Sequence, residues 1–256
     1  MTVHDVAARG FGAAGEAYEQ GRPDYPPAAV ECLVRHLEIG PGRRVLDLGA
    51  GTGKLTRCLV STGAWLVAVE PVGTMRAAFA CALPTVPVAG GAAEAIPLRD
   101  GAVDAVVVGT AFHWFDGATA LRELHRVLRP GGHLGLVWLA RDERVDWVAQ
   151  LVRLVDAFKR GDPPRYTDGR WRRPFATGSL FTPLEEAQFP FVQEAGRATA
   201  LARVASTSFV GTLSPDERRE VLRRVQTLLD THRATRDRAT LRLPYRADVY
   251  WCRRCP

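Results

Sequence analysis

The sequence of 256 residues has almost no lysine and no long hydrophobic run. Lys54 and Lys159 are its only lysines, so arginine carries nearly all of its positive charge. A membrane-spanning helix needs roughly 18–20 apolar residues, whereas the apolar stretches here are short and bounded by glycine, proline or charge. The N-terminus also lacks the apolar segment behind a basic start that marks a signal peptide. We therefore expect a cytoplasmic protein that does not bind membranes.

Cysteine is also scarce, with five widely spaced residues. Their odd number argues against a disulfide framework. Cys252 and Cys255 form a CxxC pair, but a structural zinc site usually combines two such pairs, or one pair with two histidines at finger spacing. Neither pattern is present, so we predict no metal site and interpret the two cysteines as residues of a terminal strand.

The charge is unevenly distributed along a chain of ordinary globular composition, 46% hydrophobic and 24% charged. The net charge of +6 divides into −1 for residues 1–140 and +7 for residues 141–256. A positive C-terminal half would favour an anionic substrate or partner. A solvated surface rich in arginine is the more common explanation of such an excess.

Short apolar segments alternate with amphipathic ones between residues 44 and 140. Strands are expected at 45–48, 65–69, 86–89, 103–108 and 134–139, and helices at 27–37, 54–60, 74–82 and from an Asp116 cap to about Leu128. Strands without alternation of apolar and polar residues are buried on both faces, as in a parallel sheet covered by helices. The pattern predicts a doubly wound α/β fold.

This alternation stops after Ala140. Amphipathic helices are expected at 145–158 and at 215–229, where Ser214 and Glu217 form a capping box. The segment 161–184 is rich in proline, glycine, arginine and aromatic residues, and such long loops are often lids or binding loops. A final strand, expected to be antiparallel, covers 241–252.

A glycine-rich segment, Asp47-Leu48-Gly49-Ala50-Gly51-Thr52-Gly53, follows the first predicted strand. Glycines there permit a tight turn and let a ligand approach the backbone. A dinucleotide fingerprint, GxGxxG, would have its third glycine at position 54, where lysine stands. The observed GxGxG spacing, with an acid two residues earlier, suits the ammonium group of S-adenosylmethionine better than a pyrophosphate.

Acidic residues follow the second and third strands. Glu70 lies about 20 residues past the loop, where an acid can accept hydrogen bonds from both ribose hydroxyls. It therefore indicates an adenosine ligand without distinguishing NAD from S-adenosylmethionine. Glu94 could accept a hydrogen bond from the adenine amino group, or it could be a solvated loop acid.

The segment after the fourth strand, residues 109–116, should face the reacting centre, because ligands of open α/β sheets bind beyond the carboxyl ends of the strands. His113 could take a proton from a substrate hydroxyl or amine, or it could orient the aromatic wall. Trp114 could pack on the cofactor or substrate, or simply fill the core. Further candidates for substrate binding are Tyr166, Trp171 and Arg173.

Together these segments resemble the motifs of class I S-adenosylmethionine-dependent methyltransferases. The resemblance rests on VLDLGAGTGKLT for the first motif, VAVEP with Met75 for the second, GAAEAIP for the adenine-contact segment, and AFHWFD and LHRVLRPGG around strands four and five. It is strongest to the methyltransferase type 11, or UbiE-like, group and its trans-aconitate-methyltransferase-like branch, whose start resembles Tyr18 to Pro26. The resemblance covers about residues 15–140.

The resemblance implies a Rossmann-like sheet of seven strands, mostly parallel with an antiparallel last strand, and S-adenosylmethionine as the cofactor. Tyr18 and Arg22 would close the site over the cofactor. The expected cofactor-binding residues are Tyr18, Arg22, Asp47, Gly49, Ala50, Gly51, Glu70, Pro71, Met75, Ala93, Glu94, Thr110 and Ala111. Methyl transfer would be an in-line SN2 displacement, in which positioning supplies much of the rate and a base is optional.

We accordingly expect one domain over residues 1–256. Its parts are a cofactor-binding core at 15–140, substrate-binding and lid elements with a late strand of the sheet at 141–235, and a C-terminal strand at 236–256. The acceptor is expected to be a small molecule with an oxygen, nitrogen or carbon nucleophile, an anion or a secondary metabolite among the options. Neither the acceptor nor the oligomeric state follows from the sequence.

Three other functions fit less well. An RNA methyltransferase finds only weak support in Arg170-Trp171-Arg172-Arg173. Residues 162–166, DPPRY, resemble the [ND]PP[YF] motif of amino-group methyltransferases, but they contain an extra residue and lie after strand five. The misplaced third glycine argues against an NAD-linked oxidoreductase, and the intact first motif argues against a non-catalytic protein that only binds S-adenosylmethionine.

Overall fold

The computed structural model describes residues 22–161, 164–207 and 209–256. Within them, one seven-stranded sheet has the strand order β3-β2-β1-β4-β5-β7-β6. The first five strands in this order run parallel, whereas β7 is antiparallel to both of its neighbours. The predicted doubly wound, mostly parallel sheet is thereby confirmed. The strands are β1 (Arg44–Leu48), β2 (Trp65–Val69), β3 (Val88–Ala89), β4 (Val103–Gly109), β5 (Leu128–Arg141), β6 (Glu185–Gly196) and β7 (Thr240–Arg253).

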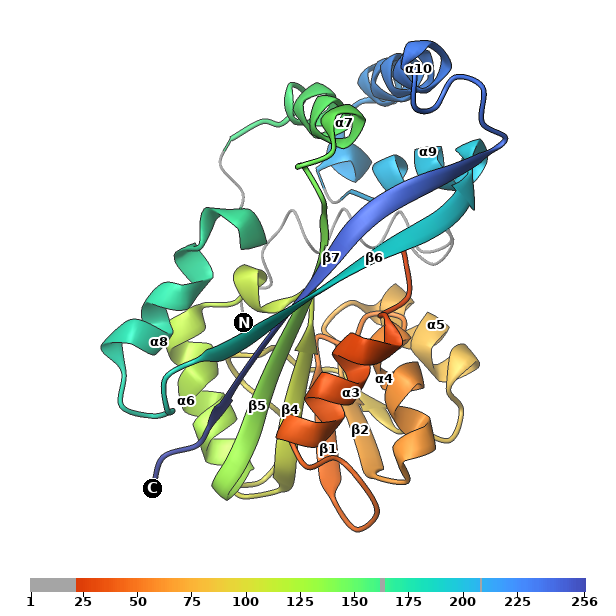
Figure 1. Cartoon of the computed structure of the whole chain (residues 1–256). Helices are drawn as coiled ribbons and strands as arrows, with labels where there is room; N and C mark the ends of the chain where they lie inside the picture. Colours follow the sequence, from red (N-terminus) through yellow and green to blue (C-terminus); the bar gives the residue numbers. More distant parts are fainter. Residues whose placement is uncertain (1–21, 162–163, 208) are drawn as a thin grey trace.

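Helices cover both faces of this sheet (Figure 1). On one face, α3 and α4 contribute Leu33 and Leu59 to a buried cluster with Val107 of β4. On the other face, α6 contributes Leu124 to a cluster with Val106. Alternate residues of β4 therefore enter different cores, which is why the consecutive residues Ala105 to Val108 are all apolar. These helices are α3 (Pro27–His36), α4 (Lys54–Leu59), α5 (Gly73–Ala82) and α6 (Gly117–Val127).

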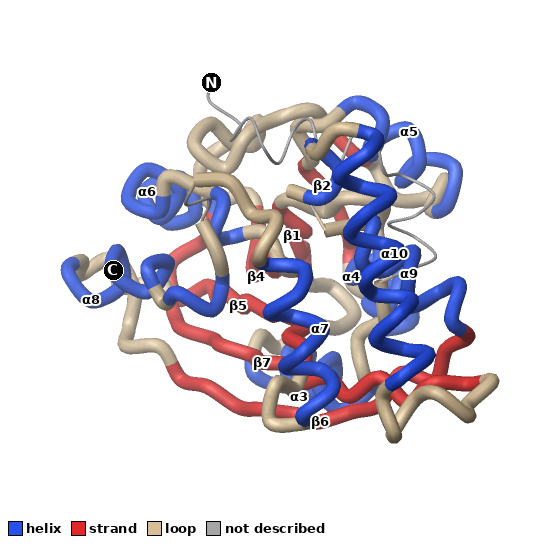
Figure 2. The backbone as a smooth tube through the Cα atoms, turned by 90° about the horizontal axis from the view of Figure 1, so that it is seen from above, coloured by secondary structure: helices blue, strands red, loops and turns tan. Residues whose placement is uncertain are grey.

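Three further helices form a cap above the carboxyl edge of the parallel strands (Figures 1 and 2). They are α7 (Asp146–Asp156), α9 (Arg197–Ala205) and α10 (Pro215–Thr231). Leu151, Val204 and Val225, one from each helix, share a buried cluster with Leu243 of β7. The cap thus has a hydrophobic core of its own, built on the C-terminal end of β6 and the N-terminal end of β7.

Strand β5 begins earlier in the structure than the sequence predicted. The sequence predicted a helix to about Leu128 and a strand from Leu134, with residues 129–132 in neither, and α6 does end at Val127. The four residues nevertheless belong to β5, which already pairs with β4 at Leu128. The register shifts between Leu128 and His133, so the glycine-rich segment forms an irregularity inside the strand.

Beyond residue 140 the sequence predicted fewer of the helices and strands that the structure contains. Both predicted cap helices are present, and the capping box of Ser214 and Glu217 is confirmed. The sequence analysis did not locate β6 or α9. β6 is an edge strand whose residues mostly alternate between half-buried and exposed, and it contains Pro190, which edge strands tolerate. The expected loop at 161–184 contains three short helices, η3 (Tyr166–Asp168), η4 (Arg170–Arg172) and α8 (Arg173–Thr177).

The described residues include neither a membrane-spanning helix nor a cluster of metal-binding side chains. No helix there combines the length and the apolar character that crossing a membrane requires. No group of three or more histidine, cysteine, aspartate or glutamate side chains there could hold a metal ion. The division of the chain at residues 140 and 235 stays a prediction.

Candidate active site

Predicted cofactor residues gather at the carboxyl edge of four neighbouring strands. Asp47 lies in β1, and Glu70, Glu94 and Thr110 follow β2, β3 and β4. Because these strands are parallel neighbours, their carboxyl ends meet at one edge of the sheet. Figure 2 looks down on this edge. Tyr18 lies outside the described residues.

The loop after β1 requires its glycines. Gly49, Gly51 and Gly53 have φ angles of +71°, +58° and +87°, a region that residues with a side chain rarely adopt. A Cβ atom on Gly49 would lie 2.9 Å from the Cβ of Ala111. The loop after β1 therefore packs directly against the segment after β4, with no room for a larger residue between them.

Asp47 is a buried acid with one unsatisfied oxygen. Thr56 Oγ1 donates a hydrogen bond of 2.5 Å to Asp47 Oδ2. Asp47 Oδ1 is enclosed and has no hydrogen-bond partner among the described residues. Burial raises the pKa of this carboxyl to about 7. A buried acceptor without a partner is rare in folded proteins, and it fits a cationic ligand group such as an ammonium.

Glu70 fastens the glycine loop to the end of β2. Its carboxylate accepts hydrogen bonds from the backbone N–H groups of Gly51 and Val72, each 2.9 Å long. Burial raises the pKa of Glu70, while these two hydrogen bonds oppose the shift. Arg76 Nη1 donates to the carbonyl oxygens of Glu70 and Pro71 at 2.8 Å. The acid predicted to bind ribose is thus held at the loop by the backbone.

Residues after β3 and β4 are also tied together. Glu94 Oε1 accepts a hydrogen bond of 2.8 Å from the backbone N–H of Asp116, so it holds the segment that follows β4. Thr110 has a φ of +55°, which is strained for a β-branched residue. Its N–H donates to the Val137 carbonyl at 2.7 Å, which helps to hold this conformation. Met75 and Ala93 are buried beneath the edge.

A pocket of about 220 Å³ lies beside this edge, between the ends of β4 and β5 and the cap. We call it the acceptor pocket. Among its lining residues are Thr110, His113 and Trp114 from the segment after β4, and Tyr166 from η3. Four arginines line it as well, Arg22, Arg141, Arg165 and Arg203, together with the acids Glu143 and Asp156.

Two of these arginines have no acidic partner in the part of the chain that the structure describes. Arg165 forms two hydrogen bonds of 2.7 Å with the Asp156 carboxylate. Arg141 and Arg203 form no ion pair among the described residues, and one guanidinium nitrogen of each is enclosed without a hydrogen bond. Burial, and then the charges of Arg22 and Arg141, lower the pKa of Arg203 to about 9. Arg203 is therefore still protonated at neutral pH, and within residues 22–161, 164–207 and 209–256 the pocket holds two cations without an ion-pair partner.

His113 is a titratable residue of the pocket that comes from the segment after β4. Trp138 Nε1 donates a hydrogen bond of 3.1 Å to His113 Nδ1. Burial is the largest cause that lowers the pKa of His113 to about 3, and the charge of Arg22 adds to the effect. The imidazole is therefore neutral at physiological pH.

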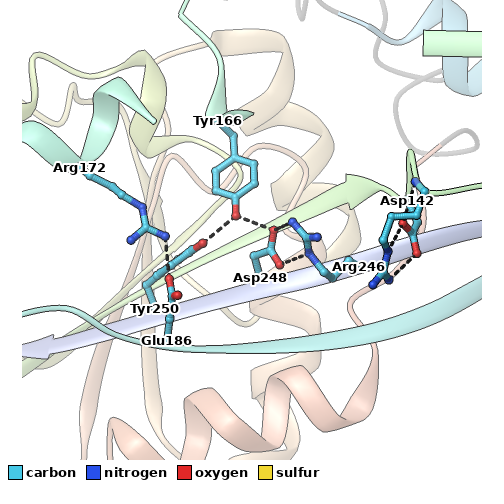
Figure 3. A network of polar contacts seen from close by, with 8 residues as sticks. Asp142, Tyr166, Arg172, Glu186, Arg246, Asp248 and Tyr250 are labelled. Atoms are coloured by element: carbon cyan, nitrogen blue, oxygen red, sulfur yellow. Dashed lines mark hydrogen bonds and ion pairs between the residues drawn. The ribbon is translucent and has the colours of Figure 1, made fainter. Parts of the chain in front are cut away.

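A polar network fixes the far wall of the pocket (Figure 3). The Tyr166 hydroxyl donates to Asp248 Oδ2 at 2.5 Å and lies 2.7 Å from the Tyr250 hydroxyl. Arg246 binds both oxygens of the fully buried Asp248, at 2.5 and 2.9 Å. Burial, followed by the hydrogen bond to Asp248, raises the pKa of Tyr166. The network thereby anchors η3 to β7.

The remaining predicted substrate residues lie elsewhere. Trp171 is buried behind the wall, where its ring lies 4.5 Å from that of Trp138 and its Nε1 donates to the Tyr166 carbonyl. Arg173 begins α8, and neither residue is among those that line the acceptor pocket. Their roles in substrate binding stay predictions.

Sequence reasoning did not find Arg141, Trp138, Arg203 or Asp248. Arg141 lies two residues after the end of predicted strand five, and its place near a carboxyl end was a usable signal. Arg203 offered none, because the helix that carries it was itself missed.

Comparisons with known proteins agree with this arrangement. A family model described as "Methyltransferase domain" matches residues 46–136. An uncharacterized methyltransferase of Mycobacterium tuberculosis is 44% identical over 235 residues, which are 92% of this chain and 91% of the relative. The match thus includes the cap as well as the cofactor edge.

Solved structures share the fold. A protein assigned as a type II methyltransferase from Anaeromyxobacter dehalogenans has a TM-score of 0.64 and 25% identity, over 91% of this chain and 97% of that one. Geranyl diphosphate C-methyltransferase from Streptomyces coelicolor, solved with S-adenosyl-L-homocysteine, has a TM-score of 0.51 and 15% identity, over 94% and 85% of the two chains. This chain belongs to the family of S-adenosylmethionine-dependent methyltransferases.

Proposed function

We propose that the protein methylates a small anionic molecule, most simply a carboxylic acid, in the acceptor pocket. The observation that carries this proposal is the pair Arg141 and Arg203, two cations without an acidic partner among the described residues. Removing a charge from water is costly unless it is paired. A carboxylate bound between the two guanidinium groups would supply the missing partner.

The cofactor side fits S-adenosylmethionine. We assign the ammonium group to Asp47, whose Oδ1 lacks a partner among the described residues, and the ribose hydroxyls to Glu70. Bound there, S-adenosylmethionine supplies an electrophilic methyl group on a positively charged sulfur. Thr110 and Ala111 lie between the glycine loop and the acceptor pocket, because Ala111 touches the loop and Thr110 lines the pocket. The cofactor and the acceptor would therefore meet at Thr110 and Ala111, with their reacting groups next to each other.

The size and charge of the pocket favour a small acid. Its volume of about 220 Å³ suits a small molecule better than a folded RNA. Four arginines and two acids give its lining a net positive charge, which attracts anions and raises their local concentration. The absence of nucleic acid as a partner, and the cytoplasmic location, stay predictions from the sequence.

The test is transfer of a tritiated methyl group from S-adenosylmethionine to two pools, a metabolite extract and total RNA. We expect label in acidic metabolites, as base-labile methyl esters if the nucleophile is a carboxylate. The variant Arg203→Met should lose this labelling while it binds S-adenosylmethionine with unchanged affinity in calorimetry. Label in RNA, or in neutral and basic metabolites only, would contradict the proposal.

A further inference from the structure

The hydrogen bond from Trp138 decides which nitrogen of the neutral His113 imidazole carries the proton. An indole N–H can only donate a hydrogen bond, so His113 Nδ1 must accept the 3.1 Å bond from Trp138. A neutral imidazole carries one proton, and that proton is then on Nε2. No hydrogen bond to Nε2 is found among the described residues, and His113 lines the acceptor pocket. The ring therefore offers a donor to the pocket.

Trp138 is held so that it cannot easily release this bond. It is only 1% exposed, and a buried indole N–H normally keeps a hydrogen-bond partner. Its ring is stacked on Tyr166 at 4.7 Å and lies 4.5 Å from Trp171. Tyr166 is in turn anchored by Asp248 and Tyr250, as Figure 3 shows. The indole thus packs against two rings that also contact each other, and its N–H is directed at His113.

The charges around His113 act against a second proton on the ring. Arg22 disfavours the imidazolium, whereas Asp168 favours it more weakly. The remaining charged or titratable groups that line the pocket are Arg141 from β5, Arg203 from α9, the Arg165–Asp156 pair, Glu143 and the Tyr166 phenol. Cations outnumber acids in this set, so the neutral ring is favoured from several sides.

We propose that His113 is a hydrogen-bond donor to the acceptor oxygen through Nε2–H, not a general base, and that Trp138 positions it by imposing this tautomer. The inference rests on the proposed function. An ionised oxygen forms its bond to the methyl carbon with its own electron pair, the carbon–sulfur bond breaks with its pair left on sulfur, and no proton moves. The pocket would thus select acceptors that arrive already ionised, which excludes phenols and amines protonated at neutral pH.

The tautomer can be tested without substrate or cofactor. In the full-length protein labelled with ¹⁵N-histidine, long-range ¹H–¹⁵N correlation NMR separates protonated from unprotonated ring nitrogens, and His113→Gln assigns the signal. We expect a protonated Nε2 and an unprotonated Nδ1 whose shifts do not change between about pH 5.5 and 9. Trp138→Phe keeps the ring stack but removes the N–H, and should give averaged shifts of mixed tautomers. Trp65→Phe, at an exposed tryptophan, is the control.

Kinetics on an acid identified by labelling tests the role. His113→Gln keeps a donor in place of Nε2–H but cannot act as a base, so it should stay within about threefold of wild-type kcat/KM. His113→Ala should lose roughly 10–100-fold, mostly as a higher KM, because a hydrogen bond to a charged group is lost. At saturating S-adenosylmethionine, the wild-type kcat/KM for the acceptor should be level from about pH 6 to 8, below the pKa of about 9 of Arg203. His125→Gln, at a histidine that binds the Cys255 carbonyl instead, is the control.

Opposite results would overturn the inference. They are an Nδ1–H tautomer, an imidazolium near neutral pH, or a rise of kcat/KM with pH that is abolished equally in His113→Gln and His113→Ala. These results would leave the proposed function standing with a histidine base. Failure of the proposed function would instead appear as an absence of labelled acids, whatever the NMR spectra show.

Discussion

The cofactor side of the site and the acceptor side are built from different kinds of segment. On the cofactor side, Asp47, Glu70 and Thr110 each lie in or next to the end of a parallel strand, and backbone hydrogen bonds hold them there. On the acceptor side, Arg141 and Arg203 come from β5 and from a cap helix more than 60 residues later. The residues of the cofactor side are therefore positioned by local backbone structure, whereas the positions of the acceptor-side residues depend on how the cap packs.

The substitution with the largest expected effect should impair the acceptor side and leave the cofactor side unchanged. Arg203→Met removes a buried cation without shortening the side chain, so we expect kcat/KM on an anionic acceptor to fall by about 100-fold or more. Calorimetry should find the affinity for S-adenosylmethionine unchanged. Arg219→Met, at an exposed arginine of α10, serves as the control. If Arg203→Met weakened cofactor binding equally, the two sides would not be independent.

Glu70→Ala should instead impair the cofactor side. We expect S-adenosylmethionine to bind about 10–100-fold more weakly, a loss of roughly 1.5–3 kcal/mol, because hydrogen bonds to a charged acceptor are removed. Isothermal calorimetry measures this loss, and Glu186→Ala, at an exposed acid of β6, is the matched control. Unchanged affinity would show that the ribose lies elsewhere.

The pH dependence of cofactor binding sharpens the assignment of Asp47. Its pKa of about 7 means that the neutral acid predominates below pH 7 and the carboxylate above it. An ammonium group binds the carboxylate, so affinity should fall about tenfold per pH unit below 7 and level off above it. Asp47→Asn should bind more weakly and lose this slope. A pH-independent wild-type affinity would argue against an Asp47–ammonium contact.

The smallest effect concerns the cap alone. Ser214→Ala removes the capping box at the start of α10 and should cost about 1 kcal/mol of local stability. Hydrogen exchange of the first turns of α10 should then rise roughly fivefold, while cofactor affinity stays constant. Thr227→Ala, inside the same helix, should show no such rise. A change in cofactor affinity would mean that cap and cofactor side are coupled.

The core of the fold was predictable because its signals are local. The apolar run Ala105 to Val108 in β4 and the capping box of α10 each reflect the physics of a few neighbouring residues. β6 escaped prediction because its alternation in burial is not matched by residue type: Val192 is exposed, whereas Gln193 is half-buried. α9 also has a modest apolar face, and its burial comes from contacts with β6 and α10, which no local pattern records.

The sequence by itself determined the glycine loop, the acid after β2 and therefore the side of the sheet that receives the cofactor. Left-handed φ angles and strand ends are local properties, and local properties can be read from residue types and their spacing. Only the tertiary structure decided that Arg141 and Arg203 line one pocket without an acidic partner among the described residues, and that the Trp138 indole donates to His113. Charge pairing and hydrogen bonding depend on distances between segments, and packing alone fixes those distances.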